Sequence, residues 1–267
     1  MTIRNNFKSA LASGSQIPLG TWLMSGAPAT AEALGHAGFD FLVLDMEHVP
    51  VGIEQVTHIL RAIGLTAADA LVRLPWNDPV TIKRVLDAGG QSIMLPFVQN
   101  ADEARAAVSA AKYPPMGTRG VAAVHRGSSY GADTGYLHTA NDQTCVIVQL
   151  ETPEAIANMP EIARIPGLDG IFIGPGDLAA AMGHIGKIDH PDVQAALADA
   201  AAQAASLSIP VGIVGASPAM VGTYISMGYR FAAVGSDMSM MTARARQVLG
   251  DLKDQDARPE TAAVSAY

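Results

Sequence analysis

The chain has 267 residues, of which 49% are hydrophobic, 16% charged and 5% aromatic, and its formal net charge is -8. This composition excludes a disordered chain, a collagen-like repeat and a disulfide scaffold, since Cys145 is the single cysteine. The 25 acidic against 17 basic side chains argue against a nucleic-acid or anionic-membrane partner. We find no apolar run near the ~20 residues of a membrane span and no secretory signal. We therefore expect a soluble, cytoplasmic protein.

Short apolar runs alternate along the chain with longer, alanine-rich stretches of helical periodicity. Several runs are apolar throughout, as in strands that are buried on both faces. The runs predict strands at Pro18–Met24, Phe39–Leu44, Ala70–Leu74, Ser92–Pro96, Thr144–Leu150, Gly170–Ile173, Val211–Val214 and Arg230–Val234. The stretches between them predict helices at Ala29–His36, Ile53–Ile63, Pro79–Asp87, Ala101–Ala111, Pro153–Arg164, Pro191–Ser206, Pro218–Met227 and Met240–Leu252.

Eight strand–helix units of about 33 residues each favour a single-domain (β/α)8 barrel, which typically has ~250 residues. A doubly wound open sheet is the alternative, although such folds more often contain five or six strands. Residues 113–141 interrupt the alternation, and connections of that length are usually functional or interfacial. No linker divides the chain. We predict one barrel domain over residues 1–254 and a flexible polar tail over residues 255–267.

Polar side chains stand where the predicted strands end. In a (β/α)8 barrel these ends meet at one face, where the catalytic groups lie. The residues at or just after the strand ends are Asp45, Glu47, His48, Arg73, Gln149, Glu151 and Asp177. The pattern therefore predicts one pocket with a histidine, an arginine and several carboxylates.

Glu151 and Asp177 follow adjacent strands and could bind a hard divalent ion together. Helix capping is the alternative role, since both residues precede predicted helices whose N-termini favour acids. Gly174 and Gly176 favour the ion, because glycines let the backbone approach a ligand closely. Two carboxylates without a histidine pair suit Mg or Mn better than a structural zinc.

His48 and Arg73 are the candidate acid/base and anion-binding groups. A neutral imidazole beside a metal-bound water could take its proton, whereas an ordinary structural histidine is the alternative. The Arg73 guanidinium needs an anionic partner in its apolar strand, and Asp45, Glu47 or a substrate carboxylate or oxyanion could be that partner. Trp22 either lines the pocket or packs in the core.

Other chemistries lack their signatures in this sequence. No lysine ends a predicted strand, which argues against a Schiff-base enzyme. Neither a GxGxxG nor a GxxxxGK[ST] motif is present, so neither fingerprint supports a nucleotide site.

Seven stretches carry a family resemblance. They are LGTW at 19–22, AGFDFLVLDMEH at 37–48, VRLPWNDP at 72–79, LPFVQNADEARAAVSAAKYPPMGTRGV at 95–121, QLETPEA at 149–155, GIFIGPGDLA at 170–179 and AVGSD at 233–237. On these residues the chain resembles the metal-dependent hydroxy-oxo-acid (pyruvate) aldolases of the HpcH/HpaI aldolase/citrate lyase superfamily. The resemblance implies an aldehyde-lyase that cleaves a 4-hydroxy-2-oxo acid to an aldehyde and pyruvate, or a related 2-oxo acid such as hydroxypyruvate, through an enolate.

The resemblance also implies roles for individual residues. Glu151 and Asp177 would ligate the divalent metal, with Mg or Mn first and Co or Zn as further candidates. Gln149, with the backbone of Gly176 and Asp177, would hold the pyruvate end, and Trp22 would contact substrate.

His48 would be the acid/base group, acting through a metal-bound water, and Arg73 would steady the enolate. The family assigns an aspartate in the third helix to raising the basicity of the histidine, and that position is Asp87 here. Asp87 is predicted at the wrong end of its unit to reach His48 within one chain. Either this pair crosses a subunit boundary, or the nearer Asp45 orients the histidine.

The resemblance further implies a homo-oligomer, commonly a hexamer built as a trimer of dimers that exchange their C-terminal helices. Two other functions stay open at this point. One is an acyl-CoA lyase like the citrate lyase β-subunit, and the other is a catalytically silent barrel that only binds a ligand.

Overall fold

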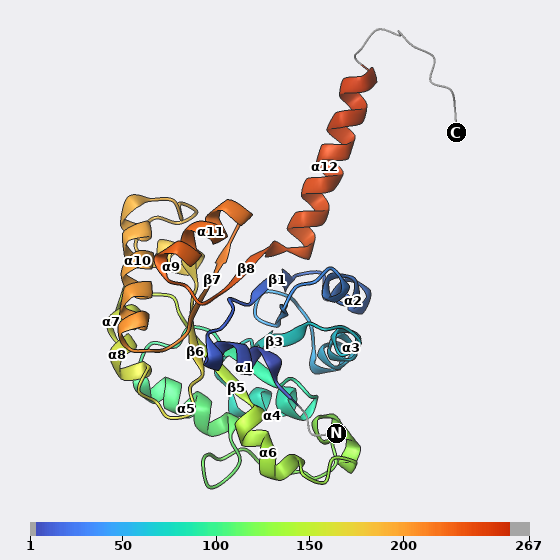
Figure 1. Cartoon of the computed structure of the whole chain (residues 1–267), viewed down its shortest axis with the longest axis vertical. Coiled ribbons are helices and arrows are strands. Elements are labelled where there is room, and N and C mark those ends of the chain that lie inside the picture. The colour runs from blue at the N-terminus through green and yellow to red at the C-terminus, as the bar shows by residue number, and fades with distance from the viewer. Residues whose placement is uncertain (1–3, 257–267) are drawn as a thin grey trace, which may run out of the picture.

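The computed structural model describes residues 4–256 and forms a closed barrel of eight parallel strands, each hydrogen-bonded to the next in chain order (Figure 1). The strands are β1 Leu19–Leu23, β2 Phe41–Asp45, β3 Asp69–Arg73, β4 Ser92–Leu95, β5 Cys145–Leu150, β6 Gly170–Ile173, β7 Val211–Gly215 and β8 Phe231–Ser236. All eight predicted strands are present, with ends that move by at most two residues. The predicted (β/α)8 barrel is confirmed, and the open-sheet alternative is wrong because β8 pairs with β1.

Helices surround the barrel. They are α1 Asn6–Ser13, α2 Pro28–His36, α3 Ile53–Ile63, α4 Pro79–Asp87, α5 Ala101–Ala111, α6 Tyr136–Gln143, α7 Pro153–Ala157, α8 Met159–Ile162, α9 Pro175–Ala181, α10 Pro191–Ser206, α11 Pro218–Met227 and α12 Asp237–Asp256, with a 3-10 turn, η1, at Arg126–Gly131. Capping residues set many of the starts. Asp78 and Ser217 each accept a backbone N–H of the first turn, with a proline next in the chain.

The helix predictions differ from the structure in five places. The helix expected over Pro153–Arg164 is two short helices, because Pro160 cannot continue the α-helical hydrogen bonding from α7. The long segment predicted as a connection contains η1 and α6, and α1 and α9 were not predicted. The last helix begins earlier than expected, directly at Asp237.

Side chains of alternating residues fill the inside of the barrel. The inner cluster includes Phe41, Leu71, Ile147 and Phe172 from four strands. Phe7 of α1 closes the N-terminal end of the barrel, with its ring centroid 4.9 Å from that of Phe41. A second, larger cluster lies between the outer surface of the strands and the helices. The packed interior leaves the C-terminal strand ends as the place where polar side chains can gather.

The last helix, α12, leaves the barrel after β8 and projects away from it, as Figure 1 shows in red. None of the helices in residues 4–256 combines the length and the apolar character needed to cross a membrane. The cytoplasmic location stays a prediction. Of the tail predicted over residues 255–267, residues 257–267 lie outside the described part of the chain.

Candidate active site

The candidate site lies at the C-terminal ends of the strands, where the inward-facing side chains of the barrel become polar. Side chains two residues apart on a strand face the same side. The inner row that contains Phe41 and Leu71 therefore continues to Asp45 and Arg73, and β2 and β3 pair Asp45 directly with Arg73 in register. On β5 the row that contains Ile147 continues to Gln149. The same alternation that fills the barrel with apolar side chains thus places these polar groups together.

Arg73 is buried and lies between two carboxylates. Its Nε and Nη2 donate to Oδ1 and Oδ2 of Asp45 at 2.9 and 2.7 Å, and its Nη1 lies 2.9 Å from Oε2 of Glu47. The guanidinium lies over the ring of Trp22, 5.1 Å from the centroid. A guanidinium has five N–H donors, and these contacts use three. The remaining two can bind oxygen atoms of a ligand, so the structural pairing and a substrate contact are compatible.

Asp45 also orders the start of the loop after β2. Its Oδ1 accepts the backbone N–H of Glu47 at 2.9 Å and, more weakly, that of His48 at 3.4 Å. Asp45 therefore holds His48 through the backbone, while the His48 residue itself is exposed to solvent. An exposed imidazole beside a buried arginine can exchange protons with water or with a ligand.

Glu151 is a buried carboxylate held from two sides. Its Oε2 accepts the backbone N–H of Phe97 at 2.8 Å, and its Oε1 accepts Nε2 of Gln149 at 2.9 Å. Burial, with a smaller contribution from the nearby charges of Asp177 and Glu47, raises the pKa of Glu151 to about 7. The Oε1 of Gln149 is buried and accepts no hydrogen bond among the described residues. The site thus contains the Glu151 carboxylate, whose charged form is disfavoured, next to Oε1 of Gln149, which has no hydrogen-bond donor among the described residues.

Glu47 and Asp177 each raise the pKa of Glu151, so three carboxylates lie within electrostatic reach of one another here. Burial raises the pKa of Glu47, and Asp45 and Asp177 raise it as well, whereas Arg73 and His48 lower it. Asp177 stands in the first turn of α9 and is exposed. Mutual repulsion among Glu47, Glu151 and Asp177 is relieved by a cation, and a set of oxygen donors is what hard divalent ions prefer. These residues fit a divalent metal.

The two glycines near Asp177 have different surroundings. A Cβ at Gly174 would lie 2.6 Å from Oε1 of Glu151, so Gly174 makes room for that carboxylate. A Cβ at Gly176 would meet nothing within 4 Å. Gly174 is therefore required by the protein's own packing, while Gly176 leaves space at the mouth of the barrel.

Asp87 lies apart from the other predicted site residues. It ends α4, a helix that runs from the C-terminal to the N-terminal end of the barrel, so within one chain it lies far from His48. Its Oδ1 accepts Nη2 of the buried Arg119 at 2.7 Å and lies 3.7 Å from Nε2 of His125. Arg119 and His125 belong to the long segment after α5.

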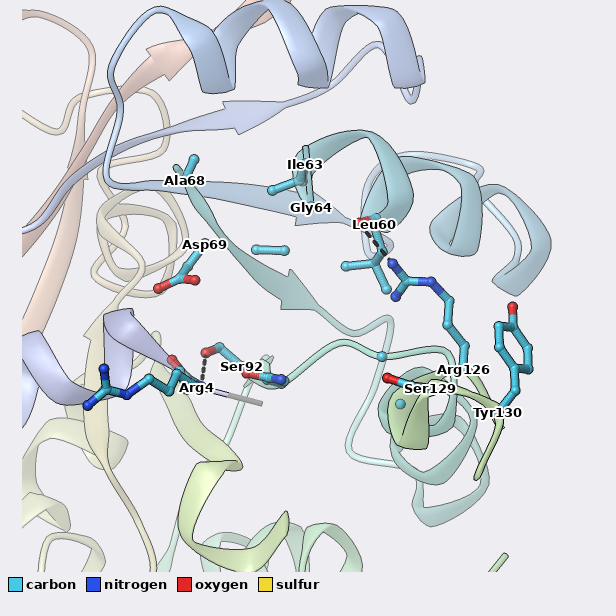
Figure 2. A pocket seen from close by; sticks show the side chains of 15 residues that line it. Arg4, Leu60, Ile63, Gly64, Ala68, Asp69, Ser92, Arg126, Ser129 and Tyr130 are labelled. Atoms are coloured by element: carbon cyan, nitrogen blue, oxygen red, sulfur yellow. Dashed lines mark hydrogen bonds between the residues drawn. The ribbon is translucent and has the colours of Figure 1, made fainter. Parts of the chain in front are cut away.

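A separate cavity of about 470 Å³ lies at the N-terminal side, with none of the strand-end residues in its lining. Figure 2 shows Arg126 directed at the end of α3, where its Nη2 donates to the Leu60 carbonyl at 3.2 Å. Asp69 and Ser92, at the starts of β3 and β4, line the same cavity. The cavity thus lies at the opposite end of the strands from Glu47, Glu151 and Asp177.

Two residues that position parts of the site, Phe97 and Asp237, were not assigned a role from the sequence. The backbone of Phe97 positions Glu151 and adopts a positive φ of 54°, which no sequence pattern signals for a phenylalanine. The buried Asp237 accepts backbone N–H groups of Met24 and Ser25 at 2.7 and 3.0 Å, tying the loop after β1 to α12. Its place directly after a strand was a signal that could have found it.

The chain is similar to known proteins over almost its whole length. The family model described as HpcH/HpaI aldolase/citrate lyase matches residues 19–243. The chain is 55% identical to the 2-dehydro-3,6-dideoxy-6-sulfogluconate aldolase of Pseudomonas putida over 93% of this chain and 97% of that protein. It is 45% identical to an Escherichia coli 4-hydroxy-2-oxo-heptane-1,7-dioate aldolase over 92% and 94% of the two chains. A solved HpcH/HpaI family protein from Burkholderia cenocepacia superposes with a TM-score of 0.91 at 39% identity, covering 93% of this chain and 99% of that chain.

Proposed function

Because the chain belongs to the HpcH/HpaI aldolase/citrate lyase family, we propose that it is a divalent-metal-dependent aldolase that cleaves a 4-hydroxy-2-oxo acid to an aldehyde and pyruvate or a related 2-oxo acid such as hydroxypyruvate. The enzyme is a carbon–carbon lyase of the aldehyde-lyase class. The observation that supports the metal-dependent reaction is the electrostatic repulsion among the carboxylates Glu47, Glu151 and Asp177, beside the buried guanidinium of Arg73.

Glu151 and Asp177 would hold the metal, and Mg or Mn suits their oxygen atoms best. When bound, such an ion withdraws electron density from the carboxylate and keto oxygens of a 2-oxo acid and so makes its C3 protons more acidic. Nε2 of Gln149 donates one N–H to Oε1 of Glu151, and its second N–H can donate to an oxygen atom at this end of the substrate. The open space at Gly176 leaves its backbone accessible to the same end.

Arg73 stabilises the negative charge that develops on the substrate oxygen. Asp45 and Glu47 fix the guanidinium in place before the substrate arrives, so little reorganisation is needed during the reaction. Trp22 covers its face and limits its movement. The guanidinium thus has a structural and a catalytic role at once.

His48 carries the proton. In cleavage it accepts, through a water molecule, the proton of the 4-hydroxyl group as the C3–C4 bond breaks, and it returns a proton to C3 when pyruvate forms. Its exposure lets it reach that water, and Asp45 fixes its backbone. If Asp87 raises the basicity of His48, it does so for the histidine of another subunit, since the two lie at opposite ends of one barrel.

The chain has features of a subunit in a homo-oligomer. The projecting helix α12 carries exposed apolar side chains, which a second copy of the chain would cover. A hexamer built as a trimer of dimers stays the prediction from family resemblance.

Proton exchange tests the core chemistry without a choice of aldehyde. Purified protein is incubated with pyruvate in deuterated buffer, with Mg²⁺ or Mn²⁺ and then with excess chelator, and the C3 methyl signal is followed by proton NMR. We expect metal-dependent loss of this signal. Failure of exchange with every divalent ion would refute the proposed enolisation. Cleavage assays with the substrates named for the two curated relatives then define the aldehyde half.

A further inference from the structure

Two histidines and a carboxylate meet where α9 connects to α10, at the opposite end of α9 from Asp177. The rings of His184 and His190 stack, with centroids 3.5 Å apart and planes inclined by 14°. Oδ2 of Asp192 lies 3.7 Å from Nε2 of His184 and 3.8 Å from Nδ1 of His190. One possible ligand atom from each of the three residues lies within 4.8 Å of the other two.

The backbone of this connection holds the cluster in place. Gly183 and Gly186 turn the chain with positive φ angles of 82° and 74°. The N–H of His184 donates to the Ala179 carbonyl at 2.7 Å, and the His184 carbonyl accepts the N–H of Lys187 at 2.8 Å. His184 therefore stands in a hydrogen-bonded turn, and His190 and Asp192 belong to the start of α10.

The distances from the Asp192 carboxylate to the two imidazole nitrogens are close to those between two ligands of one ion. A distance of 3.7 or 3.8 Å is too long for a direct hydrogen bond. Across a tetrahedral ion with bonds of about 2.0–2.1 Å, two ligand atoms lie about 3.3 Å apart, so the carboxylate has only a short distance to move. The stacked rings must separate and turn, because two imidazoles bound to one ion hold their centroids farther apart than 3.5 Å. The side chains of His184, His190 and Asp192 are 25%, 33% and 70% exposed, which lets an ion enter and keep water ligands.

A plain ion pair accounts less well for this arrangement. Two protonated imidazoles stacked face to face would repel each other, and the single carboxylate could offset only one of the two charges. A neutral imidazole has one nitrogen lone pair in the plane of its ring, and once the stack opens, Nε2 of His184 and Nδ1 of His190 can both turn toward a cation beside the carboxylate. Two imidazoles and one carboxylate suit Zn, Ni, Cu or Co, whereas the oxygen donors of the active site suit Mg or Mn.

We propose that His184, His190 and Asp192 form a second metal site, specific for a transition-metal ion of the zinc class and distinct from the active-site carboxylates. His184 binds through Nε2 and His190 through Nδ1. The ion replaces the long, 3.3 Å hydrogen bond that the Asp192 N–H donates to Nδ1 of His190. It fastens the connection to α10 and so fixes the far end of α9, the helix that carries Asp177 at its start. This site does not depend on the proposed reaction.

Cobalt titration tests the site directly. The full-length, metal-stripped Glu151→Gln/Asp177→Asn double variant is titrated with Co²⁺ in excess Mg²⁺, so that the active-site carboxylates do not contribute. We expect one Co²⁺ per chain with visible d–d absorption, displaced by Zn²⁺ and resistant to Mg²⁺. Adding His184→Ala, or separately Asp192→Asn, should weaken binding at least about tenfold, since loss of even an outer partner of a metal site typically costs that much.

Matched controls remove exposed histidines elsewhere. His58→Ala and His138→Ala, in the same double-variant background, should leave Co²⁺ binding unchanged, because both residues are exposed and far along the chain from the cluster. Melting temperatures without metal verify that each variant is folded. The proposal is overturned if the double variant binds no Co²⁺ or Zn²⁺, or if it binds them equally well without His184 and Asp192.

Discussion

Two substitutions of Arg73 can distinguish its role in catalysis from its role in stability. Arg73→Lys keeps a positive charge but replaces the planar fork with a single ammonium group, which cannot satisfy Asp45 through two parallel hydrogen bonds and still meet Glu47. We expect turnover to fall about 10²–10³-fold, the usual loss for an oxyanion-stabilising donor. Steady-state kinetics with a 4-hydroxy-2-oxo acid measure this loss.

Arg73→Ala serves as the comparison, because it leaves Asp45 buried without its cation. That change should lower the free energy of unfolding by about 3–5 kcal/mol, as expected when one partner of a buried ion pair is removed. Arg73→Lys should be clearly more stable in urea denaturation. Full activity of Arg73→Lys would contradict the assigned role of the guanidinium.

Glu151 makes the stability of the metal-free protein depend on pH. Its pKa is raised from 4.5 to about 7, mainly by burial, so its stabilising contribution is complete below pH 4.5 and is lost as pH rises through 7. The loss amounts to roughly 3 kcal/mol at pH 8. Glu151→Gln is neutral at every pH, and the Gln149 amide can turn to use its free Oε1 as acceptor. In urea denaturation without metal, this variant should match the wild type near pH 4.5 and exceed it at pH 8.

A divalent ion reverses this order. At pH 8 the metal should stabilise the wild-type protein, because the charged Glu151 binds it, and should have little effect on Glu151→Gln. The interpretation fails if Glu151→Gln is the less stable protein at both pH values without metal.

At the residue scale, the sequence predicted the members of the cluster better than their contacts. Strand ends located Asp45, Arg73 and Glu151, because charged groups directly after apolar strands are rare in this chain. The sequence left open whether Arg73 pairs with Asp45 or with Glu47, and the structure shows both pairs. The clamp from Phe97 to Glu151 was not predictable, since a positive φ at phenylalanine arises from tertiary context and not from local preference.

At the scale of elements, the start of α9 offers a matched pair of glycines. Gly174→Ala places a Cβ 2.6 Å from Oε1 of Glu151 and must displace that carboxylate, whereas Gly176→Ala places its Cβ in open space. We expect Gly174→Ala to weaken Mg²⁺ or Mn²⁺ binding at least about tenfold. Gly176→Ala should retain metal affinity. Isothermal titration of both variants decides the matter, and equal affinities would show that Gly174 does not position the ligand.

The strands and most helices were predictable because their apolar periodicity and caps agree with the final fold. The prediction was wrong where a local signal was missed or was too short to detect. Pro160 divides the helix expected over Pro153–Arg164, and the seven residues of α9 offer too few apolar positions for a period. The first helix, α1, was missed for a similar reason, since only Phe7 and Leu11 of its residues are buried.

At the scale of the whole molecule, α12 is a helix whose exposed apolar side chains are not covered by the barrel. Its large exposed apolar side chains are separated by three, seven, one and three residues, which places them on one side of the helix. They are Met238, Met241, Val248, Leu249 and Leu252, and they are 39–57% exposed. Such spacing is typical of a helix that packs against another surface. The barrel itself cannot supply that surface, because α12 projects away from it (Figure 1).

We expect Leu249→Asp/Leu252→Asp to prevent the proposed oligomer from forming, because two charges in the apolar side of α12 would then be buried without partners. Light scattering coupled to size exclusion should show a smaller species than the wild type at equal concentration. Gln247→Asp, a charge on the same helix outside the apolar repeat, is the control and should keep the native size. If the double variant retains the wild-type mass, α12 does not mediate assembly. If it dissociates and also loses pyruvate exchange while its barrel stays folded, a neighbouring subunit completes the site, which is one of the two alternatives that the separation of Asp87 from His48 leaves open.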